Sequence, residues 1–334
     1  MNLLYLLAGI ALLVLAVVDL LWTTLWVDGS AGPLSSRLTS AVWQSMRRIS
    51  SGRSRLLSVA GPVILVVTLV TWIGLIWAGW TLVFAGGGKA LIDTRAHEPV
   101  TWLGRIYYVA YTMFTMGNGD FSPNGSTWQL VTSLTTASGM LFVTMSVTYV
   151  LSVLRAVVKK RSVSTGVTGL GNRGDVLAMA GWDDSKGDFS DLDSSLSSFA
   201  TELDTLAEQH DAYPILHYYH SQSPAQSSAV AVAVLDEALT LLRYGVPDEE
   251  RPNDVVLQRA RSSTGNYLRT LNAAFIHPAE ETPPAPDLSY LRDHDAPTVS
   301  EAEFQAALDD LEDRRRKLLG MVRSDAWEWL PRES

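Results

Sequence analysis

The residues best suited to chemistry form one short segment, Thr115–Asp120, with the sequence TMGNGD. Gly117 and Gly119 lack a Cβ atom, so a positive φ costs them little and the carbonyl oxygens of the segment can turn toward a common axis. Carbonyl oxygens arranged in this way can replace the water shell of a monovalent cation. Thr115 adds a hydroxyl oxygen at one end. The spacing therefore predicts a strip of backbone that coordinates cations.

A plainer interpretation of the same segment is an ordinary extracellular turn between two helices. Asn118-Gly119 is a common turn pair, because both residues tolerate a left-handed backbone. A simple turn, however, leaves the threonine and the apolar segment before it unexplained.

The elements that must position this segment are helices in a membrane. Three apolar stretches are long enough for a bilayer, which needs about 20 helical residues. They run from Leu3 to about Val27, from about Val59 to Phe84, and from about Trp128 to Val158. Pro99–Phe114 is too short to cross, and irregular backbone at membrane depth must line a water-filled path or be covered by protein. We therefore expect an all-α membrane protein with three transmembrane helices and a re-entrant helix.

The basic residues predict the orientation of these spans. The loop between the first two spans holds five arginines against one acid, Asp28, and the third span ends in Lys159, Lys160 and Arg161. The five arginines are Arg37, Arg47, Arg48, Arg53 and Arg55. Both groups belong in the cytoplasm by the positive-inside rule. This places the N-terminus and residues 86–127 outside and the long C-terminal region in the cytoplasm, in a multi-pass protein of the cell membrane.

Charge divides the chain of 334 residues into two contrasting parts. Residues 1–161 carry 12 basic and 5 acidic side chains, whereas residues 162–334 carry 14 basic and 30 acidic ones. The second part is therefore an acidic domain that would repel a phosphate backbone, which argues against nucleic acid as a partner. The chain has no cysteine, and its sequence shows no catalytic constellation and implies no cofactor.

The cytoplasmic part divides into a linker and a helical domain. We expect an N-terminal helix with a basic interfacial segment over 1–58, a pore domain over 59–161, a linker over 162–198 and helices over 199–334. The expected helices of the last domain are Ser223–Leu242, Asn253–Ile276 and one long helix from Ser300 to about Trp329, which Ser300 and Glu303 begin as a capping box. The region carries no signature of a particular cytoplasmic regulator.

Residues 59–158 resemble the pore domain of potassium channels. The family filter is Thr-x-Gly-Tyr/Phe-Gly-Asp, and Thr115, Gly117, Gly119 and Asp120 match it. The family commonly keeps a hinge glycine in the inner helix, and Gly139 lies nineteen residues after Asp120. The chain thus resembles a bacterial potassium channel with an additional N-terminal transmembrane helix.

The resemblance implies a homotetramer in the lipid bilayer that conducts K⁺ passively. Its filter would be Thr115, Met116, Gly117, Asn118, Gly119 and Asp120, with K⁺ held at Thr115, Met116, Gly117 and Asn118. Together with Gly139, the inner-helix residues that would line the cavity and gate are Met140, Val143, Val147, Thr148 and Leu151. Each of these positions has the alternative of facing lipid or a neighbouring helix.

Asn118 departs from the family pattern, which has an aromatic residue at this filter position. That aromatic residue packs against the pore helix and holds the filter at a fixed width. Asparagine is smaller and polar, and we expect it to hydrogen-bond Tyr107, Tyr108 or a neighbouring filter. A K⁺ channel and a weakly selective channel for monovalent cations such as Na⁺ and K⁺ therefore both remain open.

Three weaker signals favour structural roles. Asp19 lies inside the first span, where a charge is a functional candidate, but a capping or packing role with Thr23 or a basic neighbour near the inner interface is preferred. Gly169–Gly174 spells GxGxxG without a strand before it, so a flexible linker is preferred to a nucleotide site. His217 and His220 could share a metal with His210, but without a firm third ligand a role in the helical bundle or at its surface is preferred.

Two further alternatives to a plain cation channel remain for the whole protein. One is a membrane-anchored scaffold or sensor that does not conduct, and the other is a nucleotide-regulated channel.

Overall fold

The computed structural model describes residues 1–26, 31–50, 54–95, 98–183, 185–274 and 276–329. Val27, Asp28 and Arg53, which entered the predictions, lie outside these ranges. The described residues form two compact units. Unit 1 is built from Met1–Trp26, Ser30–Val42 and Pro62–Val153, and unit 2 from Trp43–Gly61 and Leu154–Ser334. The chain is an all-α membrane protein, with very little sheet.

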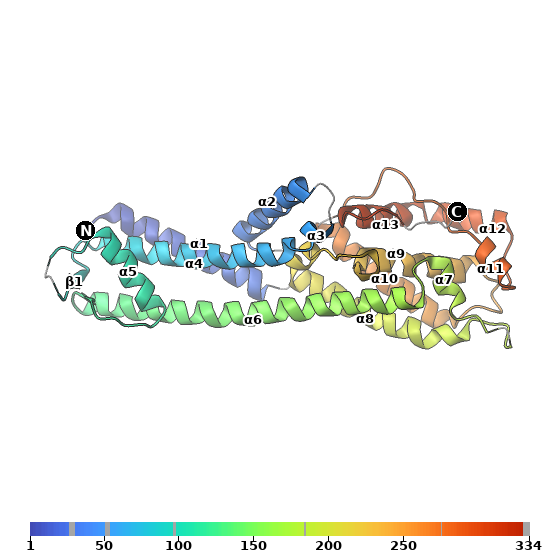
Figure 1. Cartoon of the computed structure of the whole chain (residues 1–334), viewed down its shortest axis with the longest axis horizontal. Helices are drawn as coiled ribbons and strands as arrows, with labels where there is room; N and C mark the ends of the chain where they lie inside the picture. Colours follow the sequence, from blue (N-terminus) through green and yellow to red (C-terminus); the bar gives the residue numbers. More distant parts are fainter. Residues whose placement is uncertain (27–30, 51–53, 96–97, 184, 275, 330–334) are drawn as a thin grey trace. The chain divides into compact units, whose positions relative to one another are not determined.

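The three predicted spans are confirmed as helices long and apolar enough to cross a membrane (Figure 1). They are α1 (Leu3–Leu25), α4 (Ala60–Gly86) and α6 (Ser126–Leu170). The short re-entrant segment is α5 (Trp102–Met113). Two further helices, α2 (Pro33–Ser50) and α3 (Ser54–Leu57), lie between the first two spans in the sequence.

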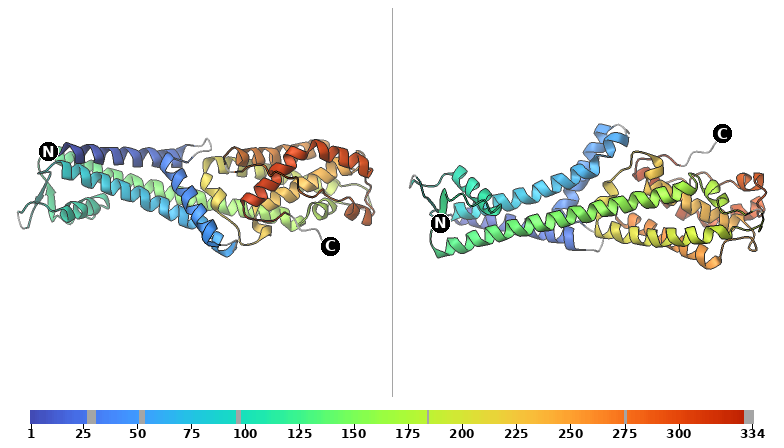
Figure 2. Two further views of the ribbon diagram at one scale, coloured as in Figure 1. Left: turned by 90° about the horizontal axis from the view of Figure 1, so that it is seen from above. Right: turned by 60° about the horizontal axis from the view of Figure 1, so that its bottom comes forward.

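Small residues allow α1 and α4 to approach closely within unit 1, where the two helices run side by side (Figure 2). A Cβ atom on Gly9 would lie 2.6 Å from the carbonyl oxygen of Gly79, and one on Gly86 would lie 2.8 Å from the amide nitrogen of Leu6. Small residues at such crossings are characteristic of helix packing in membranes, where close van der Waals contact drives association. The additional N-terminal helix is therefore packed tightly against α4.

Asp19 caps a neighbouring helix from inside the first span, so the expected capping role holds, but its partners are the start of α2 and Trp72 in place of Thr23 or a basic neighbour. Its side chain is fully buried, and Oδ1 accepts hydrogen bonds from the amides of Leu34 (2.7 Å) and Ser35 (3.1 Å) in the first turn of α2. Oδ2 accepts one from Trp72 Nε1 on α4 at 2.7 Å. The free amides at a helix N-terminus and the helix dipole both favour a carboxylate there. Asp19 thus connects α1, α2 and α4.

Unit 2 is a helical bundle around one central helix. Its elements are α7 (Gly174–Met179), η1 (Ser190–Leu192), α8 (Asp193–Ala212), η2 (Pro214–Tyr218), η3 (Pro224–Gln226), α9 (Ser228–Thr240), η4 (Leu241–Gly245), α10 (Asp254–Ala274), α11 (Ser289–Asp293), α12 (Glu301–Asp310) and α13 (Glu312–Ser324). All residues of α9 except Glu237 are buried. A helix without a polar face must be enclosed by other elements, so α9 forms the core.

The predicted linker over 162–198 is wrong, because most of it is helical: α7 lies within it and α8 begins at Asp193. Residues 162–170 continue α6, and Val163 and Val167, one helical turn apart, are each only 1% exposed in the core of unit 2. The hydroxyls of Ser164 and Thr168 donate to carbonyls one turn earlier, so these polar residues are satisfied inside the helix. Burial of the two valines therefore overrides the Gly/Ser/Thr composition of the segment.

The predicted long C-terminal helix is two helices. Ser300 Oγ accepts from the amide of Glu303, as expected for a helix start, but Leu311 has ψ near 6° and separates α12 from α13. Each piece buries its own apolar residues, among them Phe304 on α12 and Leu318 on α13. The bundle can bury both sets only if the chain changes direction between them. The helix predicted from Ser223 likewise begins later, after the Ser227 cap.

The burial of His210 in unit 2 predicts a pH-dependent stability. The side chain is buried, and burial lowers the pKa of His210 to about 3. The unfolded chain takes up this proton below about pH 6.5 while the folded chain remains neutral, so stability falls as the pH falls toward 3. We expect a loss of about 2 kcal/mol at pH 5 from this residue. Thermal unfolding of the detergent-solubilised chain between pH 7 and 5 measures it.

His210→Gln should flatten this pH dependence, and the exposed His294 provides the matched control. Because His294 is exposed, His294→Gln removes no burial cost and should leave the slope unchanged. Equal slopes for His210→Gln and the unmodified chain would contradict the assignment.

Candidate functional site

Capping at its start and aromatic packing along its length fix the pore helix α5 within unit 1. Thr101 caps its start by accepting a hydrogen bond from the amide of Gly104 at 3.1 Å. Its aromatic residues hold it against the long helices, since Tyr108 packs edge-on against Phe84 of α4 with centroids 5.1 Å apart and bonds Thr132 of α6 at 2.6 Å. The helix ends at Met113, so its C-terminus is followed directly by Thr115–Asp120.

The segment after α5 alternates in the sign of φ. Thr115, Gly117 and Gly119 have positive φ values of 58°, 59° and 76°, whereas Met116 and Asn118 do not. In a regular strand, successive carbonyl groups point to opposite sides. When φ is positive at every second residue, the carbonyl groups instead point to the same side. A β-branched residue at positive φ is a strained outlier of the kind found at functional sites. The backbone of this segment is therefore bent into the form that a row of coordinating carbonyls requires.

The carbonyl oxygens of this segment fall into two groups. That of Gly119 accepts a hydrogen bond from Thr94 Oγ1 at 2.8 Å. Those of Thr115, Met116, Gly117 and Asn118 accept no hydrogen bond from the residues that the structure describes. Residues 115–119 are also exposed in the single chain, Met116 at 65%. Four successive carbonyls are thus available to an outside partner, and these are the four residues that the sequence assigns to the cation.

A chain of polar contacts holds the outer end of the segment. Asn118 Nδ2 donates to the hydroxyl of Tyr107, and that hydroxyl donates in turn to Oδ2 of Asp120 at 3.2 Å. Oδ1 of Asp120 faces the guanidinium of Arg95 as an ion pair. The Tyr107 hydroxyl therefore uses both its donor and its acceptor capacity. Asn118 bonds Tyr107 of the pore helix, which is one of the three partners that the sequence left open.

A short two-stranded sheet, absent from the sequence-based prediction, supports the same end. β1 (Leu91–Asp93) pairs antiparallel with β2 (Phe121–Pro123), with Asp93 opposite Phe121. Tyr111 of α5 donates from its hydroxyl to the carbonyl of Phe121 at 2.8 Å. The only sequence signal for this support was the pair of tyrosines Tyr107 and Tyr111, spaced one helical turn apart on α5.

The predicted cavity residues of α6 separate into two groups. Met140, Val143, Val147, Thr148 and Leu151 are all exposed in the single chain. Gly139 is instead buried against the pore helix, where a Cβ atom would lie 2.1 Å from the carbonyl oxygen of Met113. Gly139 therefore permits direct backbone contact between α6 and the end of α5, which gives this glycine a packing role in addition to the predicted hinge.

The GxGxxG segment and the histidines among the weaker sequence signals lie in structural positions of unit 2. In the GxGxxG segment, a Cβ atom on Gly174 would lie 2.5 Å from Cβ of Glu237, so this glycine serves close packing of α7 on α9. His210 lies edge-on to Tyr267, and His220 contacts Asp325. Among the described residues, no group of three metal-ligating side chains is assembled.

The comparisons with known proteins agree with this arrangement. The protein-family profile described as ion channel matches residues 63–156, which include α5, the TMGNGD segment and most of α4. The chain is 46% identical over 329 residues to the uncharacterized membrane protein YdjJ of Bacillus subtilis (strain 168), covering 98% of this chain and 96% of the relative. No solved structure matches the chain. The protein therefore belongs to the family of the membrane protein YdjJ, and its residues 63–156 carry an ion channel pore domain of the potassium-channel family.

Proposed function

We propose that the protein is a homotetrameric channel that conducts K⁺ passively through the filter Thr115–Asp120. The observation that carries the proposal is the row of four free carbonyls at residues 115–118 on a backbone whose φ alternates in sign. Such oxygens suit a dehydrated monovalent cation. The ion channel family points to transport rather than to catalysis.

A tetramer follows from the geometry of coordination. One chain supplies one carbonyl at each level of the filter, and a fourfold axis supplies four, which is the closed arrangement that surrounds an ion. The exposed residues of α6 and the exposed filter backbone are the surfaces that such an assembly would use. The positive-inside rule places the N-terminus outside and unit 2 in the cytoplasm of the cell.

The first experiment compares two glycines at which a substitution would introduce backbone strain of the same kind. Gly117 and Gly125 both have positive φ (59° and 87°), and neither would bring a Cβ atom within 4 Å of another group. Only Gly117 lies in the proposed filter. Gly117→Ala should reduce K⁺ flux in proteoliposomes to the level of protein-free vesicles, whereas Gly125→Ala, just before α6, should retain most of it. Equal flux in the two variants, or no flux in the unmodified chain, would overturn the proposal.

A channel with weak selectivity between Na⁺ and K⁺ is the second candidate, and Asn118 favours it. The asparagine bonds the Tyr107 hydroxyl, which leaves the filter braced by one small polar contact instead of a packed aromatic ring. Asn118→Tyr should raise the preference for K⁺, measured as a shift of the reversal potential under bi-ionic conditions. A permeability ratio equal to that of the unmodified chain would remove Asn118 as the determinant of selectivity.

A further inference from the structure

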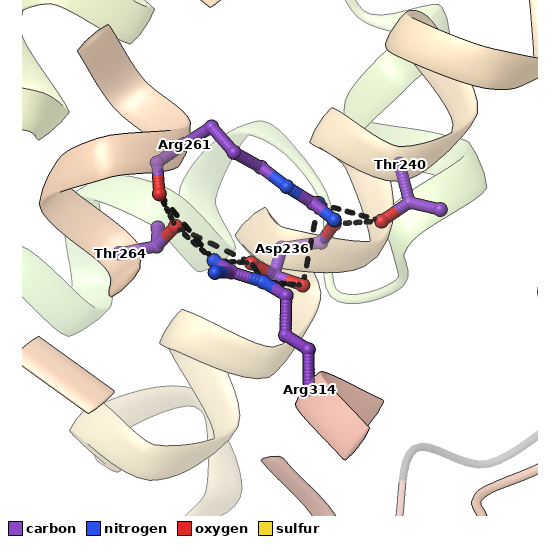
Figure 3. Close-up of polar contacts among 5 residues, drawn as sticks. All are labelled: Asp236, Thr240, Arg261, Thr264 and Arg314. Atoms are coloured by element: carbon purple, nitrogen blue, oxygen red, sulfur yellow. Dashed lines mark hydrogen bonds and ion pairs between the residues drawn. The ribbon is translucent and has the colours of Figure 1, made fainter. Parts of the chain in front are cut away.

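Unit 2 contains a buried cluster in which two arginines share one carboxylate (Figure 3). Asp236 lies in the second half of α9, and its side chain is 2% exposed. Arg314 of α13 binds both carboxylate oxygens, with its Nε 2.9 Å from Oδ1 and 3.2 Å from Oδ2. Thr264 Oγ1 adds a contact to Oδ1 at 3.3 Å. Arg314 alone therefore provides the fork that a carboxylate requires.

Arg261 of α10 is the less well satisfied of the two arginines. Its Nη1 donates to Thr240 Oγ1 at 2.8 Å but lies 3.5 Å from Oδ2 of Asp236. Its Nη2 is shielded from water and has no acceptor among the residues that the structure describes. A guanidinium carries five donors, and a buried donor without an acceptor is costly. Because two guanidinium groups face one carboxylate, the cluster of Arg261, Arg314 and Asp236 holds one positive charge in excess.

An open groove of about 390 Å³ borders Arg261. Arg243, Tyr244, Gln258 and Ser262 also line it, together with two leucines. Its volume lies in the range of about 300–1,000 Å³ that small-molecule sites occupy. The lining thus combines two cations, an aromatic ring and two neutral hydrogen-bonding side chains.

Two features of Arg243 and Tyr244 distinguish this groove from an incidental surface hollow. Both residues belong to η4, a single π-helical turn at the end of α9, and such turns occur frequently at functional sites. Arg243 pairs with Asp254, whose side chain is 76% exposed. An ion pair with so exposed a partner is weak and can be exchanged for a stronger one.

The charge of the groove runs against that of its surroundings. Residues 162–334 carry 30 acidic and 14 basic side chains, yet this groove is lined by two arginines and no acid. We propose that it binds a small organic anion, whose phosphate or carboxylate group is held between Arg243 and Arg261 and whose remaining part contacts Tyr244, Gln258 and Ser262.

Titration calorimetry on the full-length, detergent-solubilised protein tests this site, with AMP and citrate as the probes. AMP represents a phosphate on a planar base, and citrate represents a carboxylate. Adenosine, which lacks the anion, and KCl at matched ionic strength are the reference additions. We expect saturable binding of AMP or citrate at one site per chain and none of adenosine; whichever anion binds identifies the acidic group.

Arg243→Gln should weaken this binding about tenfold, because a charge-assisted hydrogen bond is lost. Arg259→Gln is the matched control, since Arg259 is an exposed arginine of α10 that bonds Thr201 outside the groove. Absence of binding by both anions, or equal affinity in the two variants, would overturn the proposal. The calorimetric measurement needs no ion flux, so its result is independent of whether the proposed channel function is correct.

Discussion

Gly139→Ala in α6 should abolish K⁺ flux and disrupt the end of the pore helix. The added Cβ atom would lie 2.1 Å from the carbonyl oxygen and 2.8 Å from the carbonyl carbon of Met113. Both are backbone atoms, so no side chain can rotate away. Overpacking of this kind costs about 1–3 kcal/mol or more, and relief requires the last turn of α5 to move. Thr115 begins the filter two residues later, so the displacement reaches the coordinating carbonyls.

The same helix provides the control for this prediction. Gly169, also in α6, would bring no Cβ atom within 4 Å of another group, so Gly169→Ala should leave flux and assembly intact. Flux in proteoliposomes and size-exclusion chromatography of both variants give the two readouts. If Gly139 acted only as a hinge, Gly139→Ala would assemble normally and lose flux alone. Normal flux in Gly139→Ala would contradict both roles.

Asp236→Asn is expected to destabilise unit 2 by about 3–5 kcal/mol, because it leaves two buried guanidinium groups without a carboxylate. Asparagine has nearly the same shape, so the loss is one of charge and not of packing. Burial alone raises the pKa of Asp236, but Arg261 and Arg314 outweigh burial and hold the pKa below its usual range. The carboxylate therefore stabilises the fold above about pH 4, and this contribution is lost as the pH falls through the lowered pKa.

Thermal unfolding of the detergent-solubilised chain, followed by tryptophan fluorescence, measures this loss. Asp254→Asn removes the exposed partner of Arg243 and should change stability by less than about 1 kcal/mol. Similar unfolding temperatures for Asp236→Asn and Asp254→Asn would show that the buried cluster contributes little.

The sequence alone predicted the elements whose formation depends on residues that are neighbours in the chain. Apolar length alone located α1, α4 and α6, because a bilayer demands about 20 apolar residues in a row. The short aromatic segment before Thr115 predicted α5, and Gly117 and Gly119 predicted the positive φ values found at these two positions. The capping role of Asp19 was also predicted, since a carboxylate inside a span must find donors, but its partners on α2 and α4 were not.

Predictions from local composition were wrong where contacts with residues far away in the sequence determine the structure. Polar residues after Arg161 predicted a linker, yet burial of Val163 and Val167 in unit 2 keeps the segment helical. The segments that form β1 and β2 lie about thirty residues apart and are only three residues each, too short to carry an alternating pattern.

From the sequence alone came the three spans, the pore helix and the glycine-bearing segment that the channel function depends on. Only the tertiary structure decided that Tyr107 links Asn118 to Asp120 and that Gly139 contacts the backbone of Met113. It alone also decided that Arg243 and Arg261 line one groove. The physical reason is that spans and turns arise from neighbours in the chain. Charge balance and close contact instead depend on which distant residues the fold brings together.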